Sequence, residues 1–203
     1  MLFSIFKYFR KSNNHYSNKK FLIVGLGNVG DEYKNTRHNI GFDIVEHLGV
    51  SLKGTFISGK YGDILKAKYA GKQIILLKPS TYMNLSGKAV LYWLKKEKIS
   101  ISNLIVVVDD LNLDFTVSRL RTSGSDGGHN GLKDISNSLN TSHFARLRFG
   151  IGNNFKKNDQ IDFVLSEWNN EESNKLSQLM EKNVEIIFSA IKKGLDFTMN
   201  KYN

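Results

Sequence analysis

The sequence has no cysteine, a single proline and only short apolar runs. The lack of cysteine excludes disulfides, thiolate metal sites, CxxC redox chemistry and a cysteine nucleophile. One proline, Pro79, leaves no proline-rich linker that would divide the chain. Apolar runs such as residues 104–108 are far shorter than the ~20 residues that cross a bilayer. The 203 residues are therefore expected to form a soluble protein with one core.

Positive charge is in excess and unevenly distributed. The chain has 29 Lys and Arg against 19 Asp and Glu, a net charge of +10. Residues 1–20 hold five basic side chains and no acid, so the remainder carries +5 (24 minus 19). We expect residues 1–20 to be a flexible basic extension, although a transit peptide has the same composition. The basic body is compatible with phosphate binding and equally with an ordinary solubilising surface.

From residue 21 the pattern is that of an alternating α/β domain. Apolar or alternating runs predict strands at 21–24, 104–108, 116–121 and 145–151, and a hairpin of 61–69 and 73–77 around residues 70–72. Helical spacing predicts helices over 40–48, 85–94 and 131–139. A long amphipathic helix follows, capped by Asn169 or Asn170 and closed by Gly194. Residues 21–203 are predicted to form a single domain.

The GLGNVG sequence at 25–30 matches the GxGxxG pattern of dinucleotide-binding enzymes and follows a predicted strand. In that fold a helix starts on the motif, whereas here the polar segment 31–39 intervenes, so the match is weak. The glycines also allow a sharp turn at the end of the strand, where α/β sheets place ligands. Asn28 in this turn can offer its amide to a ligand, or can simply bond its own backbone.

Two histidines and a pair of aspartates lie near predicted strand ends and glycine-rich turns. His38 and His129 are each followed by Asn, and either could take a proton from water or be a helix-entry residue without catalytic duty. Asp109 and Asp110 follow the strand at 104–108, and a carboxylate there can orient an imidazole. Because side chains alternate along a strand, only one of the two can point into a given site.

Other hydrolytic arrangements are poorly supported. The chain has no GxSxG nucleophile elbow and no HExxH zinc motif. His38, His129, Asp109 and Asp110 could bind a divalent ion only if they converge in space.

Further polar candidates have two explanations each. Asn84 precedes the second predicted helix, so it is either the N-cap or a second amide beside Asn28. Basic residues are concentrated between positions 116 and 148, where arginines two apart on a strand share a face. Such a stripe can bind phosphates or form a solvated sheet edge. Its members are Arg119, Arg121, Lys133, Arg146 and Arg148.

Four motifs together resemble the bacterial-type peptidyl-tRNA hydrolase family. They are GLGNVG at 25–30, EYKNTRHNIG at 32–41, KPSTYMNLSG at 78–87 and GGHNGLK at 127–133, in the family's order and with compatible spacing. The resemblance extends from about residue 21 to the C-terminus. It implies an α/β domain whose twisted, mixed and mostly parallel sheet lies between helices. It also implies an esterase without metal or cofactor that separates peptide from tRNA in prematurely released peptidyl-tRNA.

The resemblance also implies a role for individual residues. His38 corresponds to the family's base and Asp109 to the carboxylate that orients it. Asn28, Asn84 and Asn130 correspond to amides of the substrate channel, with Asn28 or Asn84 donating to the carbonyl oxygen of the ester. Tyr33 and Met83 resemble supporting walls of that pocket. We expect both, together with His129, to bind substrate. Arg121 and Arg148 correspond to residues that contact tRNA phosphates, and Arg119 and Lys133 are the weaker candidates.

This chain departs from the family pattern at Asn112, where an acid is common, at Asp114, where proline is usual, and at Asp126, which adds negative charge to the glycine loop. We expect a monomer in the bacterial cytoplasm, or in an organelle if residues 1–20 are a transit peptide. The main alternative is a non-catalytic RNA-binding protein of the same fold, similar to a plastid splicing factor, which would bind tRNA without turnover.

Overall fold

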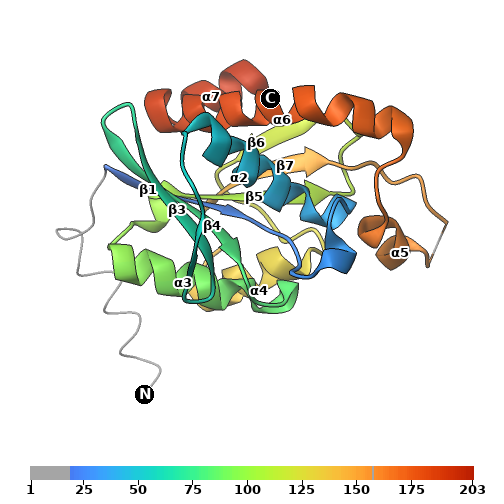
Figure 1. Ribbon diagram of the computed structural model, residues 1–203, viewed down its shortest axis with the longest axis horizontal. Helices are drawn as coiled ribbons and strands as arrows, with labels where there is room; N and C mark the ends of the chain where they lie inside the picture. The colour runs from blue at the N-terminus through green and yellow to red at the C-terminus, as the bar shows by residue number, and fades with distance from the viewer. Residues whose placement is uncertain (1–18, 157) are drawn as a thin grey trace.

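A seven-stranded sheet forms the centre of the computed structural model, which describes residues 19–156 and 158–203 (Figure 1). Its strand order is β2-β3-β4-β1-β5-β7-β6. The strands are β1 (Lys20–Gly25), β2 (Ile57–Gly59), β3 (Gly62–Tyr69), β4 (Lys72–Pro79), β5 (Leu104–Asp110), β6 (Ser118–Arg121) and β7 (Ala145–Gly150). The predicted basic extension lies outside the described residues, apart from Lys19 and from Lys20, which already belongs to β1.

The sheet is mixed, with antiparallel strands at both edges. β4, β1, β5 and β7 pair in parallel, whereas the β2–β3, β3–β4 and β6–β7 pairs are antiparallel. The predicted mostly parallel arrangement therefore holds for the four central strands only. The predicted hairpin is β3–β4. Its two turn residues, Ala70 and Gly71, have φ of 47° and 75°, and so short a connection can join only antiparallel strands.

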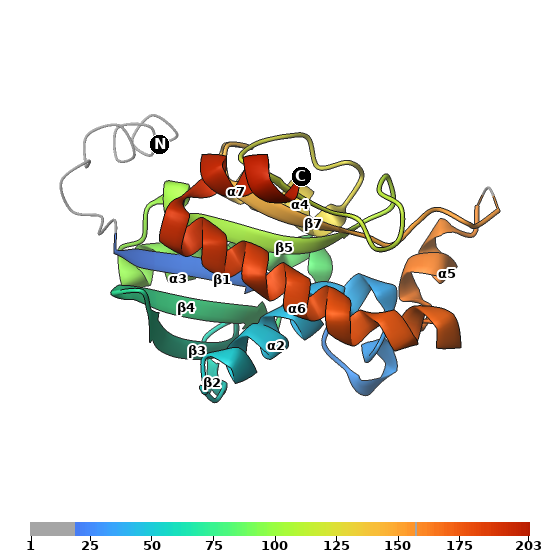
Figure 2. The ribbon, with the colours of Figure 1, turned by 90° about the horizontal axis from the view of Figure 1, so that it is seen from above.

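Helices cover both faces of the sheet (Figures 1 and 2). One face carries α2 (Ile40–Ser51), α6 (Asn170–Lys193) and α7 (Leu195–Tyr202), and the other carries α3 (Ser86–Glu97) and α4 (Asn130–Leu139). The short helix α5 (Gln160–Leu165) lies at one end of the sheet (Figure 2). None of the helices in the described part of the chain has the length and apolar character needed to span a membrane.

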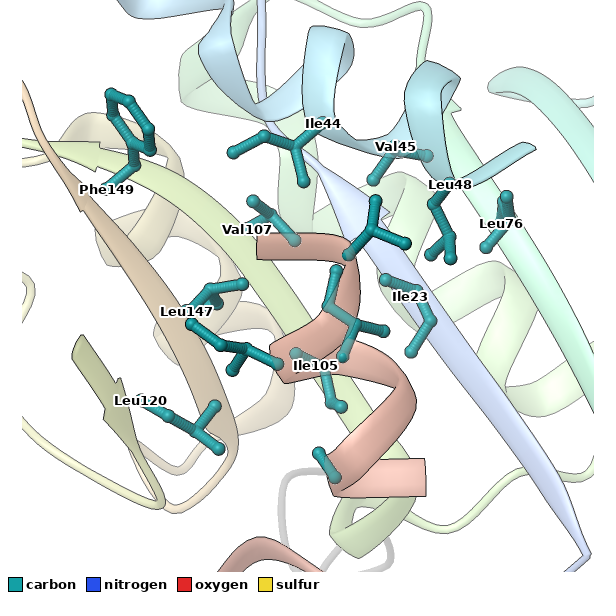
Figure 3. Packing of buried hydrophobic residues seen from close by; sticks show 14 of the residues in the cluster. Ile23, Ile44, Val45, Leu48, Leu76, Ile105, Val107, Leu120, Leu147 and Phe149 are labelled. Atoms are coloured by element: carbon teal, nitrogen blue, oxygen red, sulfur yellow. The ribbon is translucent and has the colours of Figure 1, made fainter. Parts of the chain in front are cut away.

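Strand side chains alternate between two hydrophobic clusters. Ile23 of β1 and Ile105 and Val107 of β5 pack beneath Ile44 and Leu48 of α2 (Figure 3). The intervening strand residues face α3 and α4 in the second cluster. Burial on both faces explains why residues 104–108 form a continuous apolar run.

The predicted helices are present, and the long C-terminal one has a defined start. Asn169 is its N-cap, because its side chain accepts from the Glu172 N–H at 2.9 Å while the Glu172 carboxylate accepts from the Asn169 N–H at 2.9 Å. Gly194 is the C-cap, as expected. The prediction lacks β2, α5 and α7, which have only three, six and eight residues and are too short for a clear periodicity.

Two glycines bring the start of α2 against the end of β1. A Cβ on Gly25 would lie 2.1 Å from the Gly41 carbonyl oxygen, and one on Gly41 would lie 2.4 Å from the Leu26 oxygen. The glycine motif does not lead straight into a helix, because the 3-10 helices η1 (Asp31–Tyr33) and η2 (Arg37–Asn39) precede α2. This arrangement differs from a dinucleotide site, where the helix starts on the motif.

Candidate active site

His38 and Asp109 meet beyond the carboxyl ends of the central strands. His38 belongs to η2, directly before α2, and Asp109 is the penultimate residue of β5. Nδ1 of His38 lies 2.9 Å from Oδ1 and 3.0 Å from Oδ2 of Asp109. Because an ionised carboxylate only accepts hydrogen bonds, Nδ1 of the neutral ring carries the proton and Nε2 keeps a free lone pair. Such a nitrogen can accept a proton from water.

His129 contacts the same carboxylate from the start of α4. Its Nε2 lies 3.0 Å from Oδ1 of Asp109, and its ring centroid lies 4.9 Å from that of His38. Its Nδ1 accepts from the Gly131 N–H at 3.1 Å and the Leu132 N–H at 3.4 Å, so His129 is the N-cap of α4. We call His38, Asp109 and His129 the His–Asp–His cluster.

Burial and charge act in opposite directions on this cluster. Burial favours the uncharged form of the Asp109 carboxyl, but the two imidazoles outweigh burial and hold the pKa of Asp109 well below its usual range. Burial also disfavours a charged His38 ring, but the Asp109 carboxylate outweighs it, so that the pKa of His38 is raised. The geometry therefore stabilises the imidazolium that forms when His38 takes a proton.

The cluster lines a cavity of about 120 Å³. Asn130 and Leu132 of α4, together with the glycine loop, form one side, and three residues of α5 also contribute. Within that loop the Asp126 carboxylate accepts from the Gly128 N–H at 2.9 Å. The α5 residues are Gln160, Ile161 and Val164.

Asn28 lies in the β1–η1 loop and lines a separate hollow of about 380 Å³. The side chain of Asn39 holds this loop, because it accepts from the Asn28 N–H at 2.8 Å and donates to the Asn28 carbonyl oxygen at 2.9 Å. Asn39 is buried and adjacent to His38, so the loop and the histidine are fixed together. Sequence reasoning missed this role, although the His-Asn pair was a visible signal.

Asn84, Met83 and Tyr33 do not line the cavity of the His–Asp–His cluster. Met83 and Asn84 belong to η3 (Met83–Leu85), where Met83 is buried against the start of α4 and Asn84 is exposed. Asn84 is not the N-cap of α3, which begins at Ser86 after Leu85. Tyr33 is half-buried in η1 and lines neither this cavity nor the hollow at Asn28.

The three candidate carboxamides share one property. The side-chain amides of Asn28, Asn84 and Asn130 make no hydrogen bond with any residue of 19–156 or 158–203. Asn130 alone lines the cavity that contains His38. These amides are therefore available to a ligand, whereas both the oxygen and the nitrogen of the Asn39 amide are bonded to the Asn28 backbone.

Arg37, which precedes His38, is a second residue that sequence reasoning missed. Its Nη1 donates at 2.6 Å to both the Ser166 hydroxyl and the Glu167 carbonyl oxygen, and its Nη2 pairs with Glu172 at 2.6 Å. The guanidinium carbon also lies 5.1 Å from the centroid of the Trp168 ring. Arg37 is buried, so this network anchors the His38 turn to the segment between α5 and α6.

The four arginines of the predicted stripe lie on β6 and β7, whereas its fifth member, Lys133, lies on α4. Arg119 is opposite Arg148 and Arg121 is opposite Arg146 in the antiparallel register. Leu120, which alternates with the β6 arginines, packs in the α2-side cluster, so the arginines share the opposite face.

The members of this stripe are not equivalent. Arg146 is buried and donates to the carbonyl oxygens of Ser125 and Ser142 at 2.7 and 2.8 Å, so it supports the glycine loop. Arg148 pairs with Asp110, the aspartate that points away from the histidines. Arg119 and Arg121 pair with no carboxylate in the described ranges, and Lys133 is exposed on α4. Arg121 and Lys133 are thus exposed, and the half-buried Arg119 has no carboxylate partner in the described ranges.

The His–Asp–His cluster is the one group in the described part of the chain whose ligand atoms, all within 4.8 Å of one another, could surround a metal ion. A metal-binding histidine normally donates a hydrogen bond through its second ring nitrogen. The second nitrogen of His129 instead accepts from two backbone N–H groups. A metal on Nε2 would leave that ring without its proton, so the residues do not fit a divalent ion.

An α/β domain with a histidine–aspartate pair at the ends of its central strands has the features of a hydrolase that uses a general base. A sequence profile described as peptidyl-tRNA hydrolase matches residues 22–203. The chain belongs to the peptidyl-tRNA hydrolase family.

Individual relatives agree with this assignment. The peptidyl-tRNA hydrolases of Azobacteroides pseudotrichonymphae and Phocaeicola vulgatus are 52% and 50% identical over 184 residues, which cover 91% of this chain and 99% and 98% of those proteins. A crystal structure of peptidyl-tRNA hydrolase from Acinetobacter baumannii has a TM-score of 0.86 at 34% identity and covers 94% of this chain and 97% of that one. The predicted fold class and family are therefore confirmed.

Proposed function

We propose that this enzyme hydrolyses the ester that joins the peptide to the terminal ribose of peptidyl-tRNA, with His38 as general base. The observation that carries the proposal is the pairing of His38 Nδ1 with both oxygens of Asp109, which leaves Nε2 free in a ring that lines a cavity. Family membership supplies the substrate class.

The reaction needs no covalent nucleophile, because an ester of this kind is reactive enough to be attacked by a water molecule that a general base activates. Nε2 of His38 takes a proton from water while the water oxygen adds to the acyl carbon, and Asp109 stabilises the imidazolium. The tetrahedral intermediate then breaks its bond to the ribose oxygen, which takes the proton back from His38. The products are a tRNA with a free terminal hydroxyl and a peptide carboxylic acid, which releases its proton to solvent and leaves as the carboxylate.

The carboxamides are proposed to bind the reacting groups. Asn28 lines a hollow separate from the His38 cavity, but its loop is bonded to Asn39, the residue that follows His38. Asn28 or Asn84 is proposed to donate to the developing oxyanion once substrate is bound, and Asn130, which lines the His38 cavity, to bond the peptide backbone. Their lack of internal hydrogen bonds supports these roles. A neutral peptide amide suits such a site better than a charged α-amino group, so N-acylated substrates are preferred.

Basic side chains of β6, β7 and α4 are proposed to bind tRNA phosphates. Arg119, Arg121 and Lys133 have no carboxylate partner in the described ranges, and Arg148 shares its charge with Asp110. Phosphate contacts position the tRNA without reading its sequence. We further propose a monomer that acts in the bacterial cytoplasm, because one chain supplies the whole cluster and the named relatives are bacterial.

The decisive experiment is release of N-acetyl-aminoacyl groups from tRNA by the wild type and by His38→Ala, both with a chelator present. We expect wild-type turnover to persist with chelator and His38→Ala to lose about 10² to 10⁴-fold in kcat, with tRNA affinity within a few-fold. The exposed His143 provides a matched control, His143→Ala, that should behave as wild type. Equal loss of binding and turnover in His38→Ala would contradict the assignment of His38 to chemistry. Wild-type binding without release would favour a non-catalytic RNA-binding protein.

A further inference from the structure

His129 has hydrogen bonds on both ring nitrogens, and the two bonds are of opposite kinds. Nδ1 accepts from the Gly131 and Leu132 N–H groups of α4. Nε2 faces Oδ1 of Asp109 at 3.0 Å, and that oxygen can only accept. The backbone of α4 therefore assigns the tautomer of the neutral ring, with its proton on Nε2.

This tautomer makes His129 a donor toward Asp109. Oδ1 of Asp109 receives Nε2–H of His129 at 3.0 Å and Nδ1–H of His38 at 2.9 Å, so the carboxylate is held by two rings. Only 9% of the His129 side chain and 4% of the Asp109 side chain are exposed, so water does not compete for the bond. A ring with its proton on Nδ1 would face two N–H donors and would have no proton for the carboxylate.

The start of α4, which holds His129, is closely packed against its neighbours. A Cβ on Gly131 would lie 2.7 Å from Met83 Sδ and 2.9 Å from Leu26 Cδ1, so the start of α4 packs closely against η3 and the glycine-motif loop. Asn130 follows His129 directly and lines the cavity. The position of the carboxylate and that of the Asn130 amide are thus set by one helix start.

From these contacts we infer that His129 is a positioning residue for Asp109 rather than a substrate-binding residue. Because α4 fixes His129 in the Nε2–H tautomer, its ring holds the carboxylate in the orientation that His38 requires. The hydrogen bond from Nε2–H also stabilises the negative charge of the carboxylate. The inference rests on the proposed role of His38 as general base.

The test uses His129→Asn, because Asn is a good N-cap and can keep the α4 cap, while its short side chain cannot reach Asp109. We expect Tm and KM close to wild type and a decrease in kcat of roughly 10-fold, typical of losing one hydrogen bond to a charged group. With His129 gone, Asp109 interacts more strongly with His38, so the acidic midpoint of the kcat/KM profile moves to higher pH. A residue that only capped α4 would not shift that midpoint. His143→Asn is the matched control at an exposed histidine.

A second measurement is independent of turnover. ¹⁵N spectra of histidine-labelled wild type, with His129→Asn used for assignment, should show the neutral ring of His129 protonated on Nε2 and unprotonated on Nδ1. A proton on Nδ1, or a His129→Asn enzyme with wild-type kcat and pH profile, would overturn the inference. If the wild type does not release the acyl group, or if His38→Ala releases it as fast as the wild type, the proposed function is wrong. The ¹⁵N result for the His129 tautomer does not depend on that outcome.

Discussion

The His–Asp–His cluster and the three carboxamides differ in how they are held. Asp109 is buried and receives two imidazole N–H groups, whereas the amides of Asn28, Asn84 and Asn130 make no hydrogen bond with the described residues. Groups that must keep one protonation state and orientation are fixed by the protein itself. The carboxamides proposed to bind substrate have unused donors and acceptors, so binding in the proposed way would not have to break internal bonds.

Replacing Asp109 by Asn should have the largest effect, because it removes the charge at the centre of the cluster. We expect kcat to fall roughly 10³-fold, since a neutral amide cannot stabilise the His38 imidazolium. His38 must be neutral to act as base, and its pKa is raised by Asp109, so wild-type activity is lost as pH falls through a midpoint above the ordinary value of about 6.5. In Asp109→Asn that midpoint should move to lower pH, measured as kcat/KM against pH. A wild-type midpoint below the ordinary value would argue against the pair.

Asn130→Ala and Asn39→Ala sharpen the comparison, because the two residues are of one type but only Asn39 has internal bonds. Asn130→Ala should reduce kcat/KM roughly 10-fold and leave Tm unchanged, since it removes a contact to substrate only. Asn39→Ala should lower both Tm and kcat/KM, because the half-buried backbone N–H and carbonyl of Asn28 lose their partners at a cost of about 1–3 kcal/mol. Thermal melts and release kinetics of both variants show whether each amide stabilises the fold or only contacts substrate. A large fall in Tm for Asn130→Ala would show that the amides are structural.

The arginine stripe allows a similar comparison of paired and unpaired groups, with a smaller effect. Arg119→Ala and Arg121→Ala should raise KM and each reduce the slope of log KM against log salt by about 1. Arg148→Ala should have less effect, because its charge is already balanced by Asp110. Kinetics of the wild type that do not change with salt would contradict phosphate binding by this stripe.

Asp43 allows a test of stability alone, with the smallest expected effect. Its carboxyl group is partly buried and, unlike that of Asp109, has no imidazole partner among the described residues. Burial, reinforced by Glu46 and opposed by Lys78, raises the pKa of Asp43 to about 7. Its folded pKa lies above its unfolded value of 3.8, so the folded protein loses stability as pH rises between the two. Asp43→Asn should therefore raise Tm by roughly 2–4 °C at about pH 8 and leave it unchanged at about pH 4. If the difference in Tm between Asp43→Asn and the wild type were the same at both pH values, the charge of Asp43 would not be its cause.

Much of the fold and the centre of the site could be predicted from local patterns. Residues 104–108 are apolar without interruption because both faces of β5 are covered, and the aspartates that follow had to lie at the end of that strand. The alternation rule predicted that only one of the two aspartates would face the site, and in the structure Asp109 faces the histidines while Asp110 pairs with Arg148. The same rule placed Arg119 and Arg121 on one face.

The supporting contacts could not be predicted, because they join residues far apart in the sequence. Arg37 binds groups 129 to 135 positions away, and no periodicity or motif spacing reports such a pairing. The cap formed by His129 is also invisible, since histidine is not a usual N-cap residue. Charge pattern alone likewise could not tell the buried Arg146 from the exposed Arg121, because the burial of Arg146 depends on where the glycine loop folds back.

The Arg37 network has a consequence for the order of events during synthesis. The side chain next to the proposed base binds Ser166, Glu167 and Glu172, which are made only in the last fifth of the chain. A ribosome adds roughly 5–20 residues per second from the N-terminus, so a nascent chain ending before residue 172 lacks these anchors. The turn that carries His38 then lacks these hydrogen bonds, so we expect the newly made polypeptide to hold its active geometry only after residue 172 has been added. An enzyme that cleaves peptidyl-tRNA would in this way be inactive while it is itself still attached to one.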